Sequence, residues 1–283
     1  MIGQLPLPYP FELGFMQRAL LAGLVVGVFA PMIGTFLVQK RLSLMGDGIG
    51  HVAFAGVGAG LLVGVYPLWT ALAFAIVGAL GVEWLRARRK AGGDLALALF
   101  FYSGIALGVV LASAHGGLSV SVLGFLFGQP LTVDPGEVAV ILLLGAAVVS
   151  VVVALRRVLF AIVTDEDWSK IAGLPVRGMN ALLATLTAVA VVASMQIVGV
   201  LLIAALMVLP VATGQLLGRS FRGTMGIAVA VGVGSVVVGL TASRVWGLAP
   251  GGAIVLVAAL GFLVVAIIRH SIPGGFAVEA REP

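Results

Sequence analysis

Asp47 and His51 lie four residues apart at the start of an apolar stretch, SLMGDGIGHVAFAGVGAG (43–60). On a helix this spacing places both side chains on one face, with about 5–6 Å between their Cβ atoms, so they can share a ligand. A carboxylate with an imidazole suits Zn²⁺, Mn²⁺ or Fe²⁺ better than an alkali ion. The alternative is that Asp47 caps the helix and His51 hydrogen-bonds a backbone carbonyl. Their pairing on one face favours a metal site on a transport path.

Two ligands alone hold a metal ion poorly. Most closed homo-oligomers are symmetric, so a two-fold dimer with its path on the axis would bring a second Asp47 and His51 to the same place. The sequence therefore raises the hypothesis of a four-ligand site shared between two copies. The chain has no cysteine, so thiolate ligands are excluded.

The composition is that of a membrane protein. Hydrophobic residues make up 61% of the 283 residues, charged residues only 10%, and the mean hydropathy is +1.22. These values exceed what a soluble domain tolerates. We expect an all-α polytopic membrane protein forming a single transmembrane domain over 1–283.

The apolar runs predict the helices that must position the pair. A helix needs about 20 apolar residues to cross the hydrocarbon core. About nine spans fit, and eight or ten are compatible with the same pattern. They lie near 15–38, 49–66, 67–85, 95–113, 136–155, 179–196, 197–217, 224–243 and 251–268.

The charged residues predict the orientation. Fourteen of the 16 lysines and arginines fall in alternate loops or at the C-terminus, and only Arg18 and Arg244 do not. By the positive-inside rule those loops are cytoplasmic. We therefore expect a multi-pass protein of the cell membrane with its N-terminus outside and its C-terminus in the cytoplasm. The high pI of about 10.2 then reflects topology, and no nucleic-acid partner is expected.

A cytoplasmic segment at about 156–178 is predicted to carry a short helix. Thr164 can cap it, acidic residues in its first turn suit the helix dipole, and Gly173 with Pro175 ends it. The residues of interest there are Asp165, Glu166, Asp167, Trp168, Ser169, Ile171 and Gly173. The segment is either a well-capped surface turn or a docking element for a soluble partner.

Taken together, four blocks resemble one family. RLSLMGDGIGHVAFAGVGAG, DEDWSKIAGL, VGVLLIAALMVLPVATG (198–214) and APGGAIVLVAALGFL (249–263) look like the permease subunit of ABC importers for zinc, manganese or iron. The resemblance runs from about residue 15 to 268. It implies that Asp47 and His51 sit on the metal path and that Asp165 to Gly173 is a coupling helix. It also implies that the block with Gly199 and Pro210 is a pore-side helix.

The resemblance also implies the partners. They are a second copy of the chain, two cytoplasmic ATP-binding subunits and an extracytoplasmic metal-binding protein, all organised around the lipid bilayer. The sequence contains no G-x-x-x-x-G-K-[ST] phosphate loop, so we expect no enzymatic activity in this chain and ATP hydrolysis in a separate subunit. The cargo would be a divalent metal ion, with no cofactor bound by the chain itself.

The chain departs from the family pattern at three places. Gln129 stands in LFGQP where an acid is common, Ala253 replaces a proline, and Ser169 stands where alanine is usual.

Three alternative functions remain. They are a permease for a metal chelate such as a siderophore or cobalamin, a secondary transporter driven by an ion gradient, and an intramembrane aspartyl protease. The protease would need a second acid at depth opposite Asp47, but Asp94 and Asp134 fall in or near loops.

Overall fold

The computed structural model describes residues 9–88, 93–114, 120–129 and 133–271, and within these ranges the chain is helical with no strand. Nine of the described helices are long and apolar enough to cross a membrane, as predicted. They are α1 (Gly14–Gln39), α2 (Met45–Val63), α3 (Pro67–Ala87), α4 (Gly93–Ala114), α6 (Pro135–Thr164), α8 (Val176–Ser194), α9 (Val200–Leu217), α10 (Phe221–Trp246) and α11 (Pro250–Ser271). Two short helices, α5 (Val120–Phe127) and α7 (Glu166–Ile171), complete the set.

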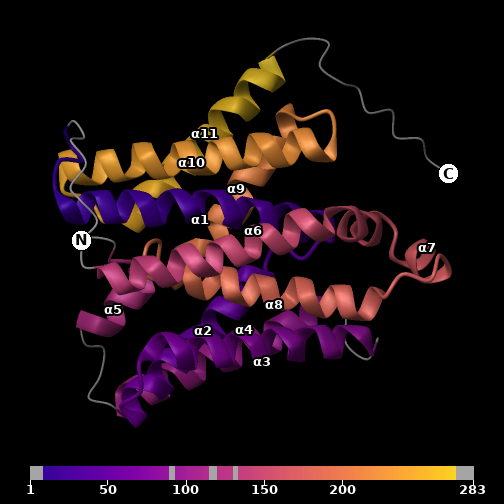
Figure 1. Cartoon of the computed structure of the whole chain (residues 1–283), viewed down its shortest axis with the longest axis horizontal. Helices are drawn as coiled ribbons and strands as arrows, with labels where there is room; N and C mark the ends of the chain where they lie inside the picture. Colours follow the sequence, from indigo (N-terminus) through magenta and orange to yellow (C-terminus); the bar gives the residue numbers. More distant parts are fainter. Residues whose placement is uncertain (1–8, 89–92, 115–119, 130–132, 272–283) are drawn as a thin grey trace.

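Helix α1 is the central helix of the bundle. It packs against α6, α8, α9 and α10 and is the most buried of the nine long helices (Figure 1). Small residues permit these close crossings. A Cβ on Gly27 would lie 3.1 Å from the carbonyl oxygen of Gly232 in α10, and one on Gly34 would overlap the Met207 carbonyl of α9. Glycine at such crossings lets backbones approach as they do in membrane helix pairs.

Two pairs of spans meet in tight turns. Gly64 ends α2 in the left-handed conformation, with φ of +75°, and Pro67 opens α3 at a position where its missing N–H costs nothing. Between α8 and α9, Gly199 has φ of +91° and precedes the first residue of α9. The α2–α3 pair is therefore a helical hairpin, whereas α9 packs mainly against α10, α11 and α1 and contacts α8 over only a few residues.

Helix α6 is longer than predicted. The expected span 136–155 and the cytoplasmic segment from 156 divided the chain at Arg156 and Arg157, whereas the structure continues one helix of 30 residues to Thr164. The apolar run after the two arginines contains no helix breaker, so the helix extends beyond the hydrophobic span. Thr164 is part of this helix, and its hydroxyl donates to the Phe160 carbonyl 2.8 Å away.

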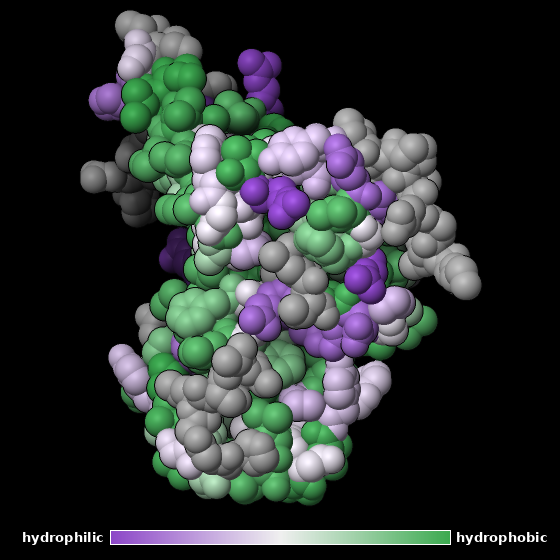
Figure 2. Space-filling model, turned by 90° about the vertical axis from the view of Figure 1, so that its left-hand side faces the viewer, coloured by the Kyte–Doolittle hydropathy of each residue, from purple (hydrophilic) through white to green (hydrophobic). Residues whose placement is uncertain are grey.

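The basic residues gather at one end of the bundle, which we call the basic end. Among the described residues all of them except Arg18 and Arg244 stand at the C-terminal ends of α1, α3, α6 and α11, near α7, or at the N-terminal ends of α8 and α10 (Figure 1). Arg89, Lys90 and Arg281 lie outside the described residues. Figure 2 views the opposite end, where hydrophilic side chains gather near the middle among hydrophobic ones.

Candidate functional site

Asp47 and His51 do lie together on one face of α2. The Nε2 atom of His51 is 3.6 Å from Oδ1 of Asp47, and the imidazole is nearly buried while the Asp47 side chain stays 30% exposed. The two side chains stand at the basic end of α2, within its first two turns. They can therefore act on one ligand together, as the spacing predicted.

Helix α4 holds the histidine in place. The ring of Phe101 meets the imidazole edge-on, with 4.5 Å between ring centroids. Gly104 lets α4 come this close, because a Cβ there would lie 2.9 Å from the carbonyl carbon of His51. In this arrangement Nε2 of the imidazole faces Asp47.

A small pocket of about 220 Å³ opens beside Asp47 between α2 and α4. Leu44, Gly48, Leu97, Phe101 and Tyr102 are among the residues that line it. Most of this lining is apolar, so the carboxylate is the group in it that can bind a cation. Through this pocket the partly exposed Asp47 side chain reaches the surface of the chain.

The structure argues against the capping interpretation of Asp47. Leu44, which makes no side-chain capping bond, occupies the N-cap of α2, and Asp47 lies inside the first turn. His51 faces Asp47 and Phe101. Within the described part of the chain no third His, Cys, Asp or Glu joins the pair to form a metal-binding group. One copy therefore supplies two ligands, and any further ligands must come from elsewhere.

The short helix α7 projects from the basic end, and its cap differs from the prediction. Asp165, and not Thr164, is its N-cap: the Asp165 carboxylate accepts a 2.8 Å hydrogen bond from the Trp168 backbone N–H. Because Thr164 is the last residue of α6, the N-cap of α7 is one residue later than predicted. Gly173, with φ of +76°, follows the helix in a left-handed conformation that glycine adopts without strain.

The two faces of α7 differ in character. Ser169 is buried against the bundle, and its hydroxyl donates to the Asp165 carbonyl. Trp168 and Ile171 are 67% and 79% exposed. Serine in place of alanine thus fits here, and the outward face offers two large apolar side chains to solvent beyond the basic end.

Glu166 ties α7 to three other helices. Its carboxylate lies 3.2 Å from Nζ of Lys40 after α1 and 3.9 Å from Arg86 on α3, and it accepts a hydrogen bond from Asn180 on α8. Lys40 also donates to Asn180, and Arg86 pairs with Glu83 at 2.9 Å. The network links α7 to the ends of α1, α3 and α8.

Burial and charge shift the pKa values of this network. Burial lowers the pKa of Lys40, and the neighbouring Arg86 lowers it further, against the opposite pull of Glu166. Burial would raise the pKa of Glu166, but Lys40, Arg86 and Lys170 outweigh it and hold that pKa below its usual value. Glu166 is therefore ionised at neutral pH and neutralises a cluster of cations.

Gly199 and Pro210 lie in and beside α9. Gly199 is buried where the backbones of three segments meet, since a Cβ on it would overlap the chain at Leu126 and Phe127. Gly128 and Gly251 make equally close approaches to the backbone around Val198. Pro210 lies within α9 and is buried. The structure thus gives Gly199 a clear packing role, and a pore-side role for either residue stays a prediction.

Tyr66, Glu137 and Gln196 form a polar cluster at the opposite end that was not predicted from the sequence. The Glu137 carboxylate accepts hydrogen bonds from the Tyr66 hydroxyl at 2.5 Å and from the Gln196 amide at 2.7 Å. Burial, together with the bond to Glu137, raises the pKa of Tyr66 to about 12. A pocket of about 200 Å³ next to it includes Gln129 and Asp134. The Asp-Pro-x-Glu pattern at 134–137 predicts a capping box and could have drawn attention to Glu137.

Known proteins resemble the chain over nearly its whole length. The manganese transport system membrane protein MntC of Listeria innocua is 30% identical over 89% of this chain and 90% of its own. The manganese import system permease protein ScaB of Streptococcus gordonii is 30% identical over 88% of this chain and 90% of its own. The structure of PsaBC from Streptococcus pneumoniae in complex with Fab superposes with a TM-score of 0.81, at 30% identity, over 90% of this chain and 91% of that chain.

The helical bundle and its projecting helix define a multi-pass membrane permease. The chain belongs to the ABC 3 transport family, whose model matches residues 12–269. The family predicted from the four sequence blocks is thereby confirmed, as is the all-α fold with nine candidate membrane helices among the described residues.

Proposed function

We propose that this chain is the membrane-spanning subunit of an ATP-driven importer of divalent transition-metal ions. The observation that carries the proposal is the Asp47–His51 pair, held at 3.6 Å on a membrane helix beside an open pocket. An ionisable pair within a span is costly and marks an ion pathway by default. Relatives named as manganese permeases support the same cargo class, with zinc and iron as the other candidates.

The metal site is completed by a second copy of the chain. One copy offers a carboxylate and an imidazole, and transition-metal sites take four or more ligands. Asp47 is partly exposed at the edge of the chain, so a two-fold partner could bring its own pair to the same ion. The exposed apolar residues Leu95, Leu99 and Tyr102 of the adjoining α4 provide a surface for that contact.

Helix α7 couples the permease to an ATPase subunit. It lies in the segment near 156–178 predicted for this role, and its exposed Trp168 and Ile171 can enter a groove on a partner. Glu166, bound to Lys40 and Arg86, would transmit the partner's movement to α1 and α3. Two ATPase subunits would serve the dimer, since each copy carries one α7.

The orientation follows from the charges. The positive-inside rule assigns the basic end to the cytoplasm, and α11 finishes at that end. The N-terminus and the Tyr66–Glu137–Gln196 cluster then face outside, where a metal-binding protein would deliver the ion. Pro210 on α9 would loosen the helix beside the path by leaving a carbonyl without its usual donor.

Uptake of radiolabelled Mn²⁺, Zn²⁺ and Fe²⁺ by cells tests the proposal. The chain is expressed with its neighbouring ATPase and binding protein, as wild type, as Asp47→Asn and as His51→Ala. His270→Ala, which removes an exposed histidine at the end of α11, is the matched control. We expect each pair variant to lose uptake of one metal by at least roughly tenfold at unchanged membrane levels. Uptake unaffected by both variants, or uptake of a siderophore complex in place of the bare ions, would overturn the proposal.

A further inference from the structure

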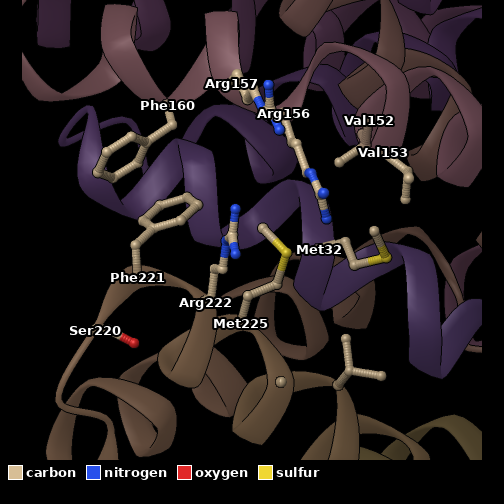
Figure 3. A pocket seen from close by; sticks show the side chains of 12 residues that line it. Met32, Val152, Val153, Arg156, Arg157, Phe160, Ser220, Phe221, Arg222 and Met225 are labelled. Atoms are coloured by element: carbon tan, nitrogen blue, oxygen red, sulfur yellow. The ribbon is translucent and has the colours of Figure 1, made fainter.

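A groove between α6 and α10 takes no part in the function proposed above. Both helices pack against α1 and leave between them a space of about 640 Å³, with Met32 of α1 at its floor (Figure 3). We call it the α6–α10 groove. Its volume falls within the range of about 300–1,000 Å³ found for specific ligand pockets.

One continuous face of each helix lines the groove. The lining positions on α6 are 152, 153, 156, 157 and 160, and those on α10 are 221, 222, 225, 226 and 229. Both sets follow the same spacing of i, i+1, i+4, i+5 and i+8, which repeats on one side of a helix over two turns. The groove therefore runs along the helix axes over about two turns of each helix.

The chemistry of the groove changes along this length. Arg156, Arg157 and Arg222 lie toward the basic end, and Val152, Val153 and Val229 lie about one to two turns deeper in the span. Because α6 and α10 run in opposite directions, their arginines meet at one end and their valines at the other. This order matches the depth profile of a bilayer leaflet, with charge at the interface and hydrocarbon below.

The three arginines of the groove have no acidic partner among the described residues. Figure 3 shows Arg156 extending from α6 and Arg222 extending from α10 toward the space between the two helices. None of the three guanidinium groups forms an ion pair with a residue of the described ranges. Three exposed cations of like charge on facing helices repel one another, so an anion bound between them would relieve that repulsion.

The phenylalanines close the groove on the basic side. The rings of Phe160 and Phe221 lie 4.8 Å apart between centroids and join α6 to α10 beyond the arginines. Phe221 also contacts Phe36 on α1. An occupant would therefore enter sideways, from the lipid that surrounds the spans, where Val153 is 48% exposed.

We propose that the α6–α10 groove binds an anionic phospholipid of the cytoplasmic leaflet. The phosphate would accept charge-assisted hydrogen bonds from Arg156 and Arg222, which suit the bidentate geometry of guanidinium groups. An acyl chain would lie along Val153, Val229 and Met32. Basic pockets between membrane helices on this side of the bilayer are recognised sites for anionic headgroups. The lipid would bridge α6, which leads into α7, to α10.

A substitution at Gly226 can block the acyl chain without changing the charges of the groove. Gly226 lines the groove, and a Cβ at this position would meet nothing within 4 Å, so Gly226→Leu adds a side chain to open space. Gly234 lies eight residues later on α10, outside the groove, and its Cβ would likewise meet nothing. Gly234→Leu is therefore the matched control for the added bulk.

Native mass spectrometry of the purified full-length chain tests the proposal. Wild type, Arg156→Gln/Arg222→Gln, Gly226→Leu, Gly234→Leu and Arg244→Gln are each exchanged into detergent with phosphatidylglycerol or phosphatidylcholine at equal concentration. Arg244 is an exposed arginine at the far end of α10 and controls for the loss of charge. Inorganic phosphate is added in a parallel series, and the thermal midpoint of every variant without lipid checks folding.

The expected result is a retained phosphatidylglycerol adduct on wild type, Gly234→Leu and Arg244→Gln, with no comparable phosphatidylcholine adduct. The adduct falls by at least roughly tenfold in the double arginine variant and in Gly226→Leu, at unchanged thermal midpoints. Competition by phosphate alone at the lipid's concentration would overturn the lipid assignment. Equal adducts on all variants would overturn the site, and a changed oligomeric state of Gly226→Leu would show that a second copy fills the groove instead.

Discussion

Nζ of Lys40 lies 3.2 Å from a carboxylate oxygen of Glu166, which is 126 residues further along the chain. The contact joins the end of α1, the central helix, to the projecting helix α7. Lys40 is almost fully buried there, with only 5% of its side chain exposed. A buried cation needs a partner, so Glu166 both fixes α7 and permits the burial of Lys40.

Glu166→Gln should destabilise the base of the bundle. The substitution removes the charge that neutralises Lys40 and Arg86, and because Glu166 is one-third exposed we expect a loss of about 1–2 kcal/mol in the free energy of unfolding. Asp167→Asn is the control, since that carboxylate is 78% exposed and pairs only with the exposed Lys170 among the described residues. Thermal unfolding of both variants in detergent measures the difference. Equal midpoints for the two variants would contradict this role of Glu166.

The same contribution should depend on pH. The folded protein lowers the pKa of Glu166 below its ordinary value of 4.5, so folding favours the charged form. The stabilisation is then complete above pH 4.5 and is lost as the pH falls through the lower folded-state pKa. We expect the difference in thermal midpoint between wild type and Glu166→Gln to be constant from pH 7 to 5 and to shrink below pH 4.5. A difference that persists unchanged at pH 3 would refute the assignment.

Trp168→Ala should weaken coupling and leave the fold intact. The indole is 67% exposed in the chain, so its removal costs little stability, whereas a tryptophan at the centre of an interface typically contributes about 2 kcal/mol or more to binding. Binding of the purified ATPase subunit and its stimulation by the permease are the measurements, with Lys170→Ala as a control on the same helix. Undiminished ATPase binding by Trp168→Ala and by Ile171→Ala would rule out α7 as the docking element.

Gly104→Ala should displace α4 from α2 and so disturb the Asp47–His51 pair. A Cβ at this position would lie 2.8 Å from the Val52 nitrogen and 2.9 Å from the His51 carbonyl carbon, so α4 must move away from α2. We expect a loss of about 1–3 kcal/mol from the strained packing and a fall in metal uptake. Gly261→Ala on α11 meets nothing within 4 Å and should instead gain about 0.5–1 kcal/mol. Similar thermal midpoints for both variants would contradict this packing role.

The spans and the basic end were predictable because hydropathy and charge act over long stretches of sequence. The Asp47–His51 pairing was predictable because both residues lie on one helix. The length of α6 was not, since Arg156 and Arg157 read as the start of a loop although the apolar run after them continues the helix. The same error displaced the cap of α7 from Thr164 to Asp165.

The Tyr66–Glu137–Gln196 cluster shows what local patterns cannot supply. Its three residues come from the starts of α3 and α6 and from the α8–α9 turn, and only the packing of the bundle brings them within 3.4 Å of one another. The α6–α10 groove is of the same kind. The positions of its arginines in the sequence indicated the membrane topology. Their convergence in space, however, depends on how α6 and α10 pack against α1.

The stoichiometry of Mn²⁺ binding tests the central claim most directly. Titration calorimetry on the purified permease, with light scattering to count the copies, compares wild type with Asp47→Asn and with His270→Ala. A site completed by two Asp47–His51 pairs predicts one ion for every two chains, bound by wild type and His270→Ala and lost from Asp47→Asn. One ion per chain, or binding that survives Asp47→Asn unchanged, would contradict the shared metal site.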